Sequence, residues 1–148
     1  MDHAPVIREA TPGDAEGLEQ CMHSAYAIYL DRMDAEQLPP LNLDYANEIQ
    51  RYPTWVVELD GSIVGGLVMV FESDFASVAN IGVAQEAQGS GIGKRLLQHA
   101  ERQAGTRGFR EIRLATHVLL SENVSLYQHL GFREGSRDET RVYLRKSL

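Results

Sequence analysis

The sequence predicts an α+β domain with a central mixed, mostly antiparallel twisted sheet flanked by helices. Two patterns support this prediction. Strand-like segments gather in residues 54–83, whereas strand and helix patterns alternate in the second half of the chain. The expected order is β-α-α-β-β-β-α-β-α-β, which differs from that of a doubly wound parallel sheet. The length of 148 residues fits one domain, 1–148, with a sizeable core.

One strand and two helices are expected in the first third of the chain. Residues 5–11 have the pattern of a short strand, and a helix then begins with Thr11 or Asp14 as its cap. The apolar positions of this helix recur every three or four residues: Ala15, Leu18, Met22, Ala25 and Tyr29. The prolines in residues 38–40 interrupt the pattern, and a second helix is expected over about residues 44–51.

Three strands are expected in the middle of the chain. Residues 54–59 are rich in β-forming side chains, and Asp60-Gly61 is a strong signal for a two-residue hairpin. Residues 62–71 follow as an apolar strand, in which Gly65-Gly66 indicates a bulge. Residues 75–83 supply the third strand of this meander.

A glycine-rich loop and a long helix are expected after these strands, together from Gly89 to about Ala104, with Gly105 as the stop of the helix. Its predicted core positions are Leu96, Leu97, Ala100 and Ala104. Glycine after the last periodic residue is the usual end of a helix, because glycine adopts the left-handed conformation without strain.

The end of the chain predicts two further strands around a helix. Residues 111–119 have the pattern of a buried strand, and residues 140–145 alternate as a final strand. Between them, residues 121–130 are typical of a helix that Ser121 caps and Gly131 ends.

Composition excludes several classes of function. The net charge of −7 argues against nucleic-acid binding, which requires a basic surface. The longest apolar run, residues 63–71, is too short to span a membrane, and the first residues lack the pattern of a secretory signal, so a cytoplasmic protein is expected. One cysteine, Cys21, excludes an internal disulfide and is expected in the core. No metal site is expected, because the histidines show no ligand spacing: His3, His23, His99, His117 and His129.

The charges are unevenly distributed along the chain. Residues 1–75 carry three arginines and fourteen acidic residues, whereas residues 76–148 carry eleven basic and seven acidic residues. Such a molecule has the charges to hold a cationic partner on one side and an anionic one on the other. The alternative is that both halves are ordinary solvated surface.

A glycine-rich segment between a predicted strand and a predicted helix indicates an anion site. It reads Gln88-Gly89-Ser90-Gly91-Ile92-Gly93-Lys94-Arg95. Glycines let backbone N–H groups approach a ligand closely, and a helix N-terminus adds a partial positive charge. Neither the Walker spacing nor the dinucleotide pattern G-x-G-x-x-G fits the glycines at 89, 91 and 93. A helix start without a ligand is the alternative.

The segment does fit the pattern Q/R-x-x-G-x-G/A, at Gln88, Gly91 and Gly93. With this motif the chain resembles the GNAT superfamily of acetyl-CoA-dependent N-acetyltransferases. Ile81-Gly82-Val83 looks like the end of the fourth strand of that family, and Ser121–Glu134 looks like its Asn-to-Tyr helix followed by Leu-Gly-Phe. The closing RVYLRK is similar to its last strand. The resemblance spans about residues 54–146, together with the opening strand and turn, and implies a GNAT-like fold.

The resemblance implies that acetyl-CoA is the cosubstrate. Backbone N–H groups from Gly89 to Lys94 would hold the CoA pyrophosphate, and the main chain of Ile81–Val83 would pair with the pantetheine arm where neighbouring strands splay apart. The predicted cofactor contacts are Ile81, Gly82, Val83, Gln88, Gly89, Ser90, Gly91, Ile92, Gly93, Lys94, Arg95, Asn123 and Tyr127. For Asn123 the alternative is a turn or cap residue.

The resemblance further implies direct attack of a primary amine on the thioester. The backbone N–H of Val83 would stabilise the oxyanion, and Tyr127 would protonate the leaving thiolate, since a thiol ordinarily has a pKa of about 8.5. Helical spacing also allows Tyr127 a packing role. The predicted catalytic residues are Tyr127, Asn80 and Glu72.

The general base departs from the family pattern. Some members carry a glutamate in the fourth strand, and the corresponding position here is Ser77, which cannot act alone. Glu72 and Asp74 lie just upstream and would act through water, whereas Asn80 would touch the substrate. Because this glutamate is missing, the alternative function is a non-catalytic acetyl-CoA- or CoA-binding regulatory module of the same fold.

The acceptor is expected to be a small-molecule or peptidyl amine. By the resemblance, the region between the first two helices lines the acceptor pocket, so Tyr26, Tyr29 and Tyr45 are predicted substrate residues, with core packing as the alternative. The acidic half of the chain favours a cationic amine. Neither nucleic acid nor a membrane is an expected partner. Dimers are common in such folds, so a homodimer is compatible with the sequence.

Overall fold

Seven strands and four helices make up the computed structural model, which describes residues 4–148. The strands are β1 (Val6–Glu9), β2 (Thr54–Leu59), β3 (Ser62–Phe71), β4 (Ala76–Val83), β5 (Glu111–His117), β6 (Arg133–Arg137) and β7 (Arg141–Ser147). The helices are α1 (Ala15–Ala27), α2 (Tyr45–Arg51), α3 (Ile92–Thr106) and α4 (Ser121–His129). Short 3₁₀ segments occur at Pro12–Asp14, Ala35–Gln37, Pro39–Leu41 and Gln85–Ala87. His3 lies outside the described residues.

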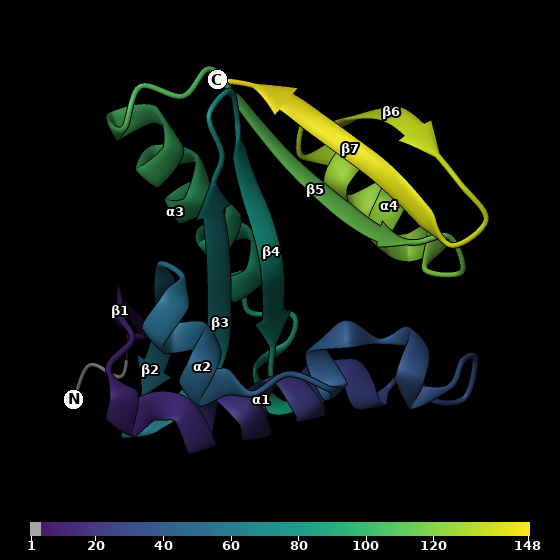
Figure 1. Ribbon diagram of the computed structural model, residues 1–148. Coiled ribbons are helices and arrows are strands. Elements are labelled where there is room, and N and C mark those ends of the chain that lie inside the picture. The colour runs from purple at the N-terminus through teal and green to yellow at the C-terminus, as the bar shows by residue number, and fades with distance from the viewer. Residues whose placement is uncertain (1–3) are drawn as a thin grey trace. The chain divides into compact units, whose positions relative to one another are not determined.

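The strands form one sheet in the order β1-β2-β3-β4-β5-β7-β6 (Figure 1). β4 and β5 pair in parallel, whereas β1 with β2, β2 with β3, β5 with β7 and β6 with β7 pair antiparallel. The parallel register covers only Ala76 with Ile112 and Ser77 with Arg113. A mixed, mostly antiparallel sheet with four helices confirms the predicted α+β fold class.

The chain divides into two compact units, which are described separately. Unit 1 comprises the chain up to Met69 together with Asn80–His99, and unit 2 comprises Val70–Ala79 and Ala100–Leu148. Strands β3 and β4 and helix α3 contribute residues to both units. The expectation of one domain stays a prediction.

Unit 1 packs helix α1 against the strands. Leu18 and Met22 of α1, Tyr45 of α2 and Val56 of β2 form a buried cluster. The close approach requires glycine on β3, because a Cβ at Gly66 would lie 2.4 Å from Leu18 Cδ1. The predicted bulge is present beside this pair of glycines: the β2–β3 register shifts between Val57 and Glu58.

Unit 2 contains a sheet with one buried face and one open face. Burial alternates along β5 and β7, so that Ile112, Leu114, Val142 and Leu144 are buried while their neighbours on the other face are at least partly exposed. Helix α4 lies against one face of β5, β7 and β6, and the opposite face is turned toward the viewer (Figure 1). Apolar packing therefore fixes which side chains of these strands point outward.

Several predicted boundaries are confirmed. The strands over residues 54–59 and 62–71 have those bounds, and the hairpin between them has positive φ at both Asp60 and Gly61 (51° and 79°). Helix α2 begins after Asp44, whose side chain accepts a hydrogen bond from the backbone N–H of Asn47. The predicted core positions of α3 are each at most 2% exposed.

Three features differ from the sequence predictions. Helix α3 continues through Gly105 to Thr106, and the turn that ends it uses Gly108, whose φ is 86°. Ser121 is the first residue of α4 rather than its cap. Strand β6 was not expected, because all five of its residues are exposed and no apolar alternation marks it; it exists through its pairing with β7.

Cys21 lies in the core of unit 1, as expected, with 2% of its surface exposed. Burial raises the pKa of its thiol to about 12. Among residues 4–148, no helix is both long and apolar enough to cross a bilayer. Within the same residues, no cluster of three or more His, Cys, Asp or Glu side chains has an arrangement that would hold a metal ion.

Candidate active site

The glycine-rich loop of unit 1 exposes a run of backbone N–H groups. Gly89 and Gly91 adopt left-handed conformations, with φ of 83° and 84°. A Cβ at either position would meet no atom within 4 Å, so these glycines face open space. They are required by the turn of the backbone, because other residues rarely adopt this conformation.

The N–H groups of this loop have no partner within the described chain. The first backbone hydrogen bond of α3 runs from Arg95 N–H to the Gly91 carbonyl, so the N–H groups from Gly89 to Lys94 remain unpaired among residues 4–148. Their partial positive charges add to the dipole of a helix of 15 residues. Donors of this kind suit a pyrophosphate group, and the role that the sequence assigns to the loop stays a prediction.

Two side chains hold the loop in place. The amide nitrogen Nε2 of Gln88 donates to the carbonyl of Val83 over 3.0 Å, which ties the loop to the end of β4. The Ser90 hydroxyl donates to the Ala87 carbonyl. Both side chains thus act on the protein backbone. Ile92 is 3% exposed, so only its backbone is available to a ligand.

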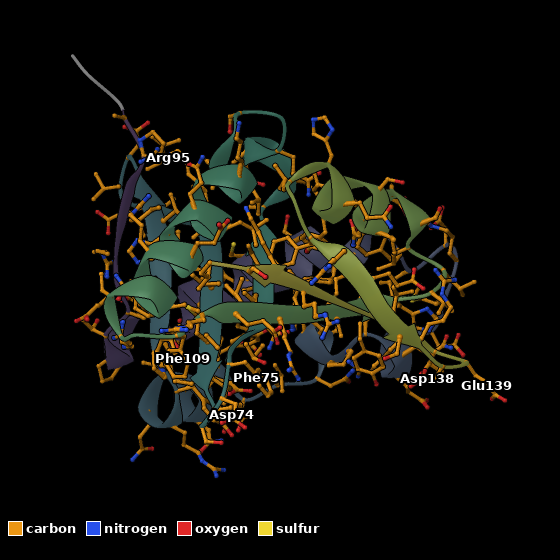
Figure 2. The ribbon with its side chains drawn as sticks, turned by 90° about the horizontal axis from the view of Figure 1, so that it is seen from above. Asp74, Phe75, Arg95, Phe109, Asp138 and Glu139 are labelled. Carbon is orange, nitrogen blue, oxygen red and sulfur yellow. The ribbon has the colours of Figure 1, made fainter. Side chains whose placement is uncertain are left out.

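The two cations at the start of α3 differ in their surroundings. Lys94 is exposed. Arg95 is also exposed, and its guanidinium donates to the carbonyl of Pro5 over 3.3 Å, which directs it toward β1 (Figure 2). Of the two predicted phosphate contacts, Lys94 is therefore the one without a recorded side-chain partner in the described chain.

The carboxyl end of β4 is held by helix α1. The Tyr26 hydroxyl donates to the Ile81 carbonyl over 2.7 Å. A Cβ at Gly82 would lie 2.8 Å from Met22 Sδ and 3.2 Å from the Ala25 Cβ, so glycine here allows α1 to pack against the strand. The parallel register with β5 ends at Ser77, before the predicted pantetheine-binding residues Ile81–Val83.

The three predicted substrate tyrosines have different environments. Tyr45 is 2% exposed and its hydroxyl donates to the Pro40 carbonyl, so it packs in the core, the alternative left open by the sequence. Tyr26 and Tyr29 are half-buried, with ring centroids 5.9 Å apart in an edge-on arrangement. Tyr26 also holds the end of β4, and both Tyr26 and Tyr29 stay predicted substrate residues.

Asn123 and Tyr127 lie one turn apart on α4, in unit 2. Tyr127 is half-buried and meets Phe132 edge-on, with ring centroids 6.0 Å apart. The backbone N–H of Asn123 donates to the Leu120 carbonyl within the first turn of the helix. Both side chains thus occupy one helix face, at the spacing that the resemblance requires.

The candidate base residues lie beside a cavity of about 690 Å³ in unit 2. Glu72 and Ser77 both line it, whereas Asp74 is exposed in the turn between β3 and β4 (Figure 2). Asn80 is half-buried and follows directly after Ala79, which also lines the cavity. The structure thus brings the predicted Glu72 and the Ser77 position into one cavity.

The sequence did not single out the arginines of this cavity. Arg113, Arg141 and Arg145 line the cavity from β5 and β7. In His117, at the end of β5, Nδ1 accepts the backbone N–H of Leu119, while Nε2 is buried without a hydrogen-bond partner among the described residues. Only strand register, which the sequence did not supply, would have placed the arginines together.

Comparisons with known proteins agree with this architecture. The model of the acetyltransferase (GNAT) family matches residues 19–132. The chain is 31% identical over 137 residues to an uncharacterized N-acetyltransferase, YjgM, of Escherichia coli strain K12, covering 87% of this chain and 82% of that protein.

Solved structures share the fold. The PaiA N-acetyltransferase of Thermoplasma acidophilum, in complex with coenzyme A, has a TM-score of 0.88 and 22% identity, covering 98% of this chain and 99% of that one. The ribosomal-protein-S18-alanine N-acetyltransferase of Escherichia coli has a TM-score of 0.75 and 19% identity, covering 97% of this chain and 94% of that one.

The chain belongs to the acetyltransferase (GNAT) family, as the sequence predicted. The family confirms the expected class of enzyme, an N-acetyltransferase with acetyl-CoA as cosubstrate. The acceptor and the roles of individual residues stay predictions.

Proposed function

We propose that this protein transfers the acetyl group of acetyl-CoA to the nitrogen of a primary amine. The observation that carries the proposal is the run of unpaired N–H groups from Gly89 to Lys94 at the start of α3. Two left-handed glycines keep this run open, and Gln88 ties it to the end of β4. A pyrophosphate satisfies such donors, which an apolar or cationic ligand does not.

The end of β4 supports the rest of the cosubstrate. Acetyl-CoA, when bound, supplies an activated acetyl thioester. The parallel β4–β5 register ends at Ser77, so the main chain of Ile81–Val83 is a suitable partner for the pantetheine amides. Tyr26 holds the Ile81 carbonyl, and α1 packs against Gly82, so this stretch of backbone is fixed before any ligand binds.

The chain would perform three tasks during transfer. The N–H of Val83 would donate toward the acetyl oxygen as negative charge develops there. The hydroxyl of Tyr127 would donate a proton toward the sulfur as the bond between the sulfur and the acetyl carbon breaks. Asn123 would orient the thioester end of acetyl-CoA. Glu72 would accept the proton of the amine through water, because Ser77 cannot, while Asn80 would touch the amine.

The first test is isothermal titration of the protein with acetyl-CoA, CoA and ATP. We expect acetyl-CoA and CoA to bind and ATP not to bind. Release of free CoA is then measured across a panel of primary amines. Failure of both CoA species to bind would refute the cofactor site, whereas binding without CoA release from any amine would indicate a binding-only module of the same fold.

A further inference from the structure

Three arginines form a row across the sheet of unit 2. The register places Arg113 of β5 opposite Arg145 of β7, and Arg145 opposite Arg133 of β6. Ser77 of β4 is the register partner of Arg113, so it continues the row. Residues directly opposite one another on neighbouring strands share a face, so these side chains point to the same side of the sheet.

That side is the open face of unit 2. The alternating residues of β5 and β7, such as Leu114 and Leu144, are buried on the other side. Helix α4 lies on the side opposite to the open face (Figure 1). The row of arginines is therefore presented outward from the packed side of unit 2.

The row is poorly compensated by acidic side chains. Like charges directly opposite one another on paired strands destabilise a sheet. Arg113 is paired with the Glu111 carboxylate, and its guanidinium lies 3.8 Å from the Phe75 ring centroid. Arg133 and Arg145 have no carboxylate partner within residues 4–148. The row therefore carries positive charge that no carboxylate of the described chain compensates, and an anionic ligand would compensate it.

Two arginines of the row, Arg113 and Arg145, line the cavity of about 690 Å³. Arg113, Arg141 and Arg145 contribute to its wall, and Glu72 is the one acidic residue among those that line it. Arg141 also lacks a carboxylate partner in the described chain; its register partner is His117, at the carboxyl end of β5. A cavity of this volume is typical of a small-molecule site.

We propose that this cavity binds the carboxylate of the acceptor, so that the substrate is a small amine that carries a carboxylate, not a polycation. The inference rests on the proposed function. Guanidinium groups bind carboxylates through two parallel hydrogen bonds, and Arg141 and Arg145 are free to do so. Ala79 lines the cavity and leads directly into Asn80–Val83, the stretch assigned to the reacting groups.

The acidic half of the sequence suggested a cationic amine as the acceptor, whereas the residues of this cavity favour an acceptor with a negative group. Three arginines against one glutamate repel an amine with several positive charges. A single ammonium group beside a carboxylate is compatible with the cavity, because Glu72 faces the cation while the arginines bind the anion.

The test compares matched pairs of amines by isothermal titration into the protein saturated with CoA. Each pair consists of an L-amino acid and its C-terminal amide, and spermidine is the polycation. We expect at least one amino acid to bind tighter than its amide by about tenfold or more, because a charge-assisted hydrogen bond is lost in the amide. Spermidine should not bind.

Arg145→Gln and Arg141→Gln should each remove most of this discrimination while the affinity for acetyl-CoA is unchanged. Arg137→Gln is the matched control, since Arg137 lies on the same β6–β7 hairpin, pairs with Glu134 and does not line the cavity. Thermal melting shows that each variant is folded; removing one of several like charges should not lower stability.

The outcomes separate this inference from the proposed function. Carboxylate-dependent binding without release of CoA would support the anion site and refute amine acetylation. Equal binding of acids and amides, no binding of any pair, or a preference for spermidine would overturn the anion site. Loss of acetyl-CoA affinity in Arg145→Gln would also overturn it, because the arginines would then serve the cosubstrate.

Discussion

The two units of the molecule present unpaired positive groups of different kinds. Unit 1 carries thirteen acidic and five basic residues in its sequence, yet it contains the glycine-rich loop. There the positive potential comes from unpaired backbone N–H groups at a helix start. Unit 2 carries eight acidic and nine basic residues, and its cavity is lined by three arginines, of which Arg141 and Arg145 have no carboxylate partner in the described chain.

The comparison shows that the charge of a site depends on which groups are left unpaired. Net charge describes solubility and long-range attraction, whereas a binding pocket responds to groups within a few ångströms. In unit 1, the loop that is proposed to bind an anion belongs to a segment of the chain with an excess of acidic residues. In unit 2, nearly balanced charges are separated locally: Glu134 pairs with Arg137 and Glu111 with Arg113, whereas Arg141 and Arg145 of the cavity have no carboxylate partner in the described chain.

The largest effect is expected from Gly91→Glu in unit 1. The new side chain would strain a backbone with φ of 84° and place a carboxylate at the predicted pyrophosphate position. Together these costs should weaken acetyl-CoA binding by about a thousandfold, measured by titration. Gly105→Glu is the matched control, since Gly105 lies near the other end of α3 with open space around it. Similar losses in both variants would contradict the loop assignment.

A smaller effect, on rate alone, is expected from Tyr127→Phe in unit 2. The ring and its contact with Phe132 remain, but the proposed proton donor is lost. The turnover number should fall about a hundredfold while the affinity for acetyl-CoA stays within about twofold. Initial rates of CoA release and a parallel titration give the two values. Tyr52→Phe is the control for loss of a tyrosine hydroxyl elsewhere; unchanged turnover in Tyr127→Phe would eliminate the general-acid role.

Tyr26→Phe should produce a still smaller change, and the change should be in the affinity for acetyl-CoA and not in the turnover number. It removes the hydrogen bond to the Ile81 carbonyl, so β4 is held less firmly where the pantetheine arm is proposed to pair. Loss of one hydrogen bond corresponds to about a three- to tenfold increase in the Kd for acetyl-CoA. Titration across several temperatures checks this value. A fall in turnover with unchanged Kd would instead indicate a direct role in the reaction.

The smallest effect concerns stability and leaves both sites intact. Asp14 accepts hydrogen bonds from the Arg8 guanidinium at 2.8 and 3.0 Å, and this pairing holds the pKa of the carboxyl well below its usual range. The stabilisation is present above the unfolded Asp pKa of about 3.9 and is lost as pH falls below it. Asp14→Asn should lower the free energy of unfolding by about 1 kcal/mol at pH 7.

Urea unfolding at pH 7 and pH 3.5 checks the sign of this effect. The difference between Asp14→Asn and the natural protein should shrink at the lower pH, where the natural carboxyl loses part of its advantage. A constant difference at both pH values would show that the ion pair does not carry the stabilisation. Acetyl-CoA affinity at pH 7 should match in the two proteins, since the Asp14 side chain is hydrogen-bonded to Arg8 and Thr11, which are not predicted cofactor residues.

Local patterns predicted much of the fold and the cofactor loop. Strands β2 and β3 have their expected bounds because Asp60-Gly61 fixes the hairpin between them, and the glycine-rich segment comes directly before α3, as expected. These signals act over a few neighbouring residues. Strand β6 has no such signal, because its stability comes from backbone pairing with β7 and from no apolar pattern of its own.

The arginine row was beyond sequence reasoning for a related reason. Arg113 and Arg145 are 32 positions apart, and only the register of β5 with β7 makes them neighbours. The burial of Tyr45 in the core could not be predicted from the sequence for the same reason. Its type and position were compatible with a substrate contact, but packing against Leu18 and Met22 buries it. Contacts between residues far apart in the sequence determine which side chains meet in a site or in the core. The spacing of apolar residues, in contrast, determines which segments form helices and strands.

The burial of Cys21 matters for a protein that handles a thioester. A thiolate in contact with acetyl-CoA would compete with the amine for the acetyl group, and it would also form mixed disulfides with the CoA that is released. With 2% of its surface exposed and a pKa of about 12, the single sulfhydryl of this chain is almost entirely protonated and inaccessible at neutral pH. The cysteine is thereby protected from acetylation and from forming a disulfide with CoA, and free thiol detected during turnover is that of CoA.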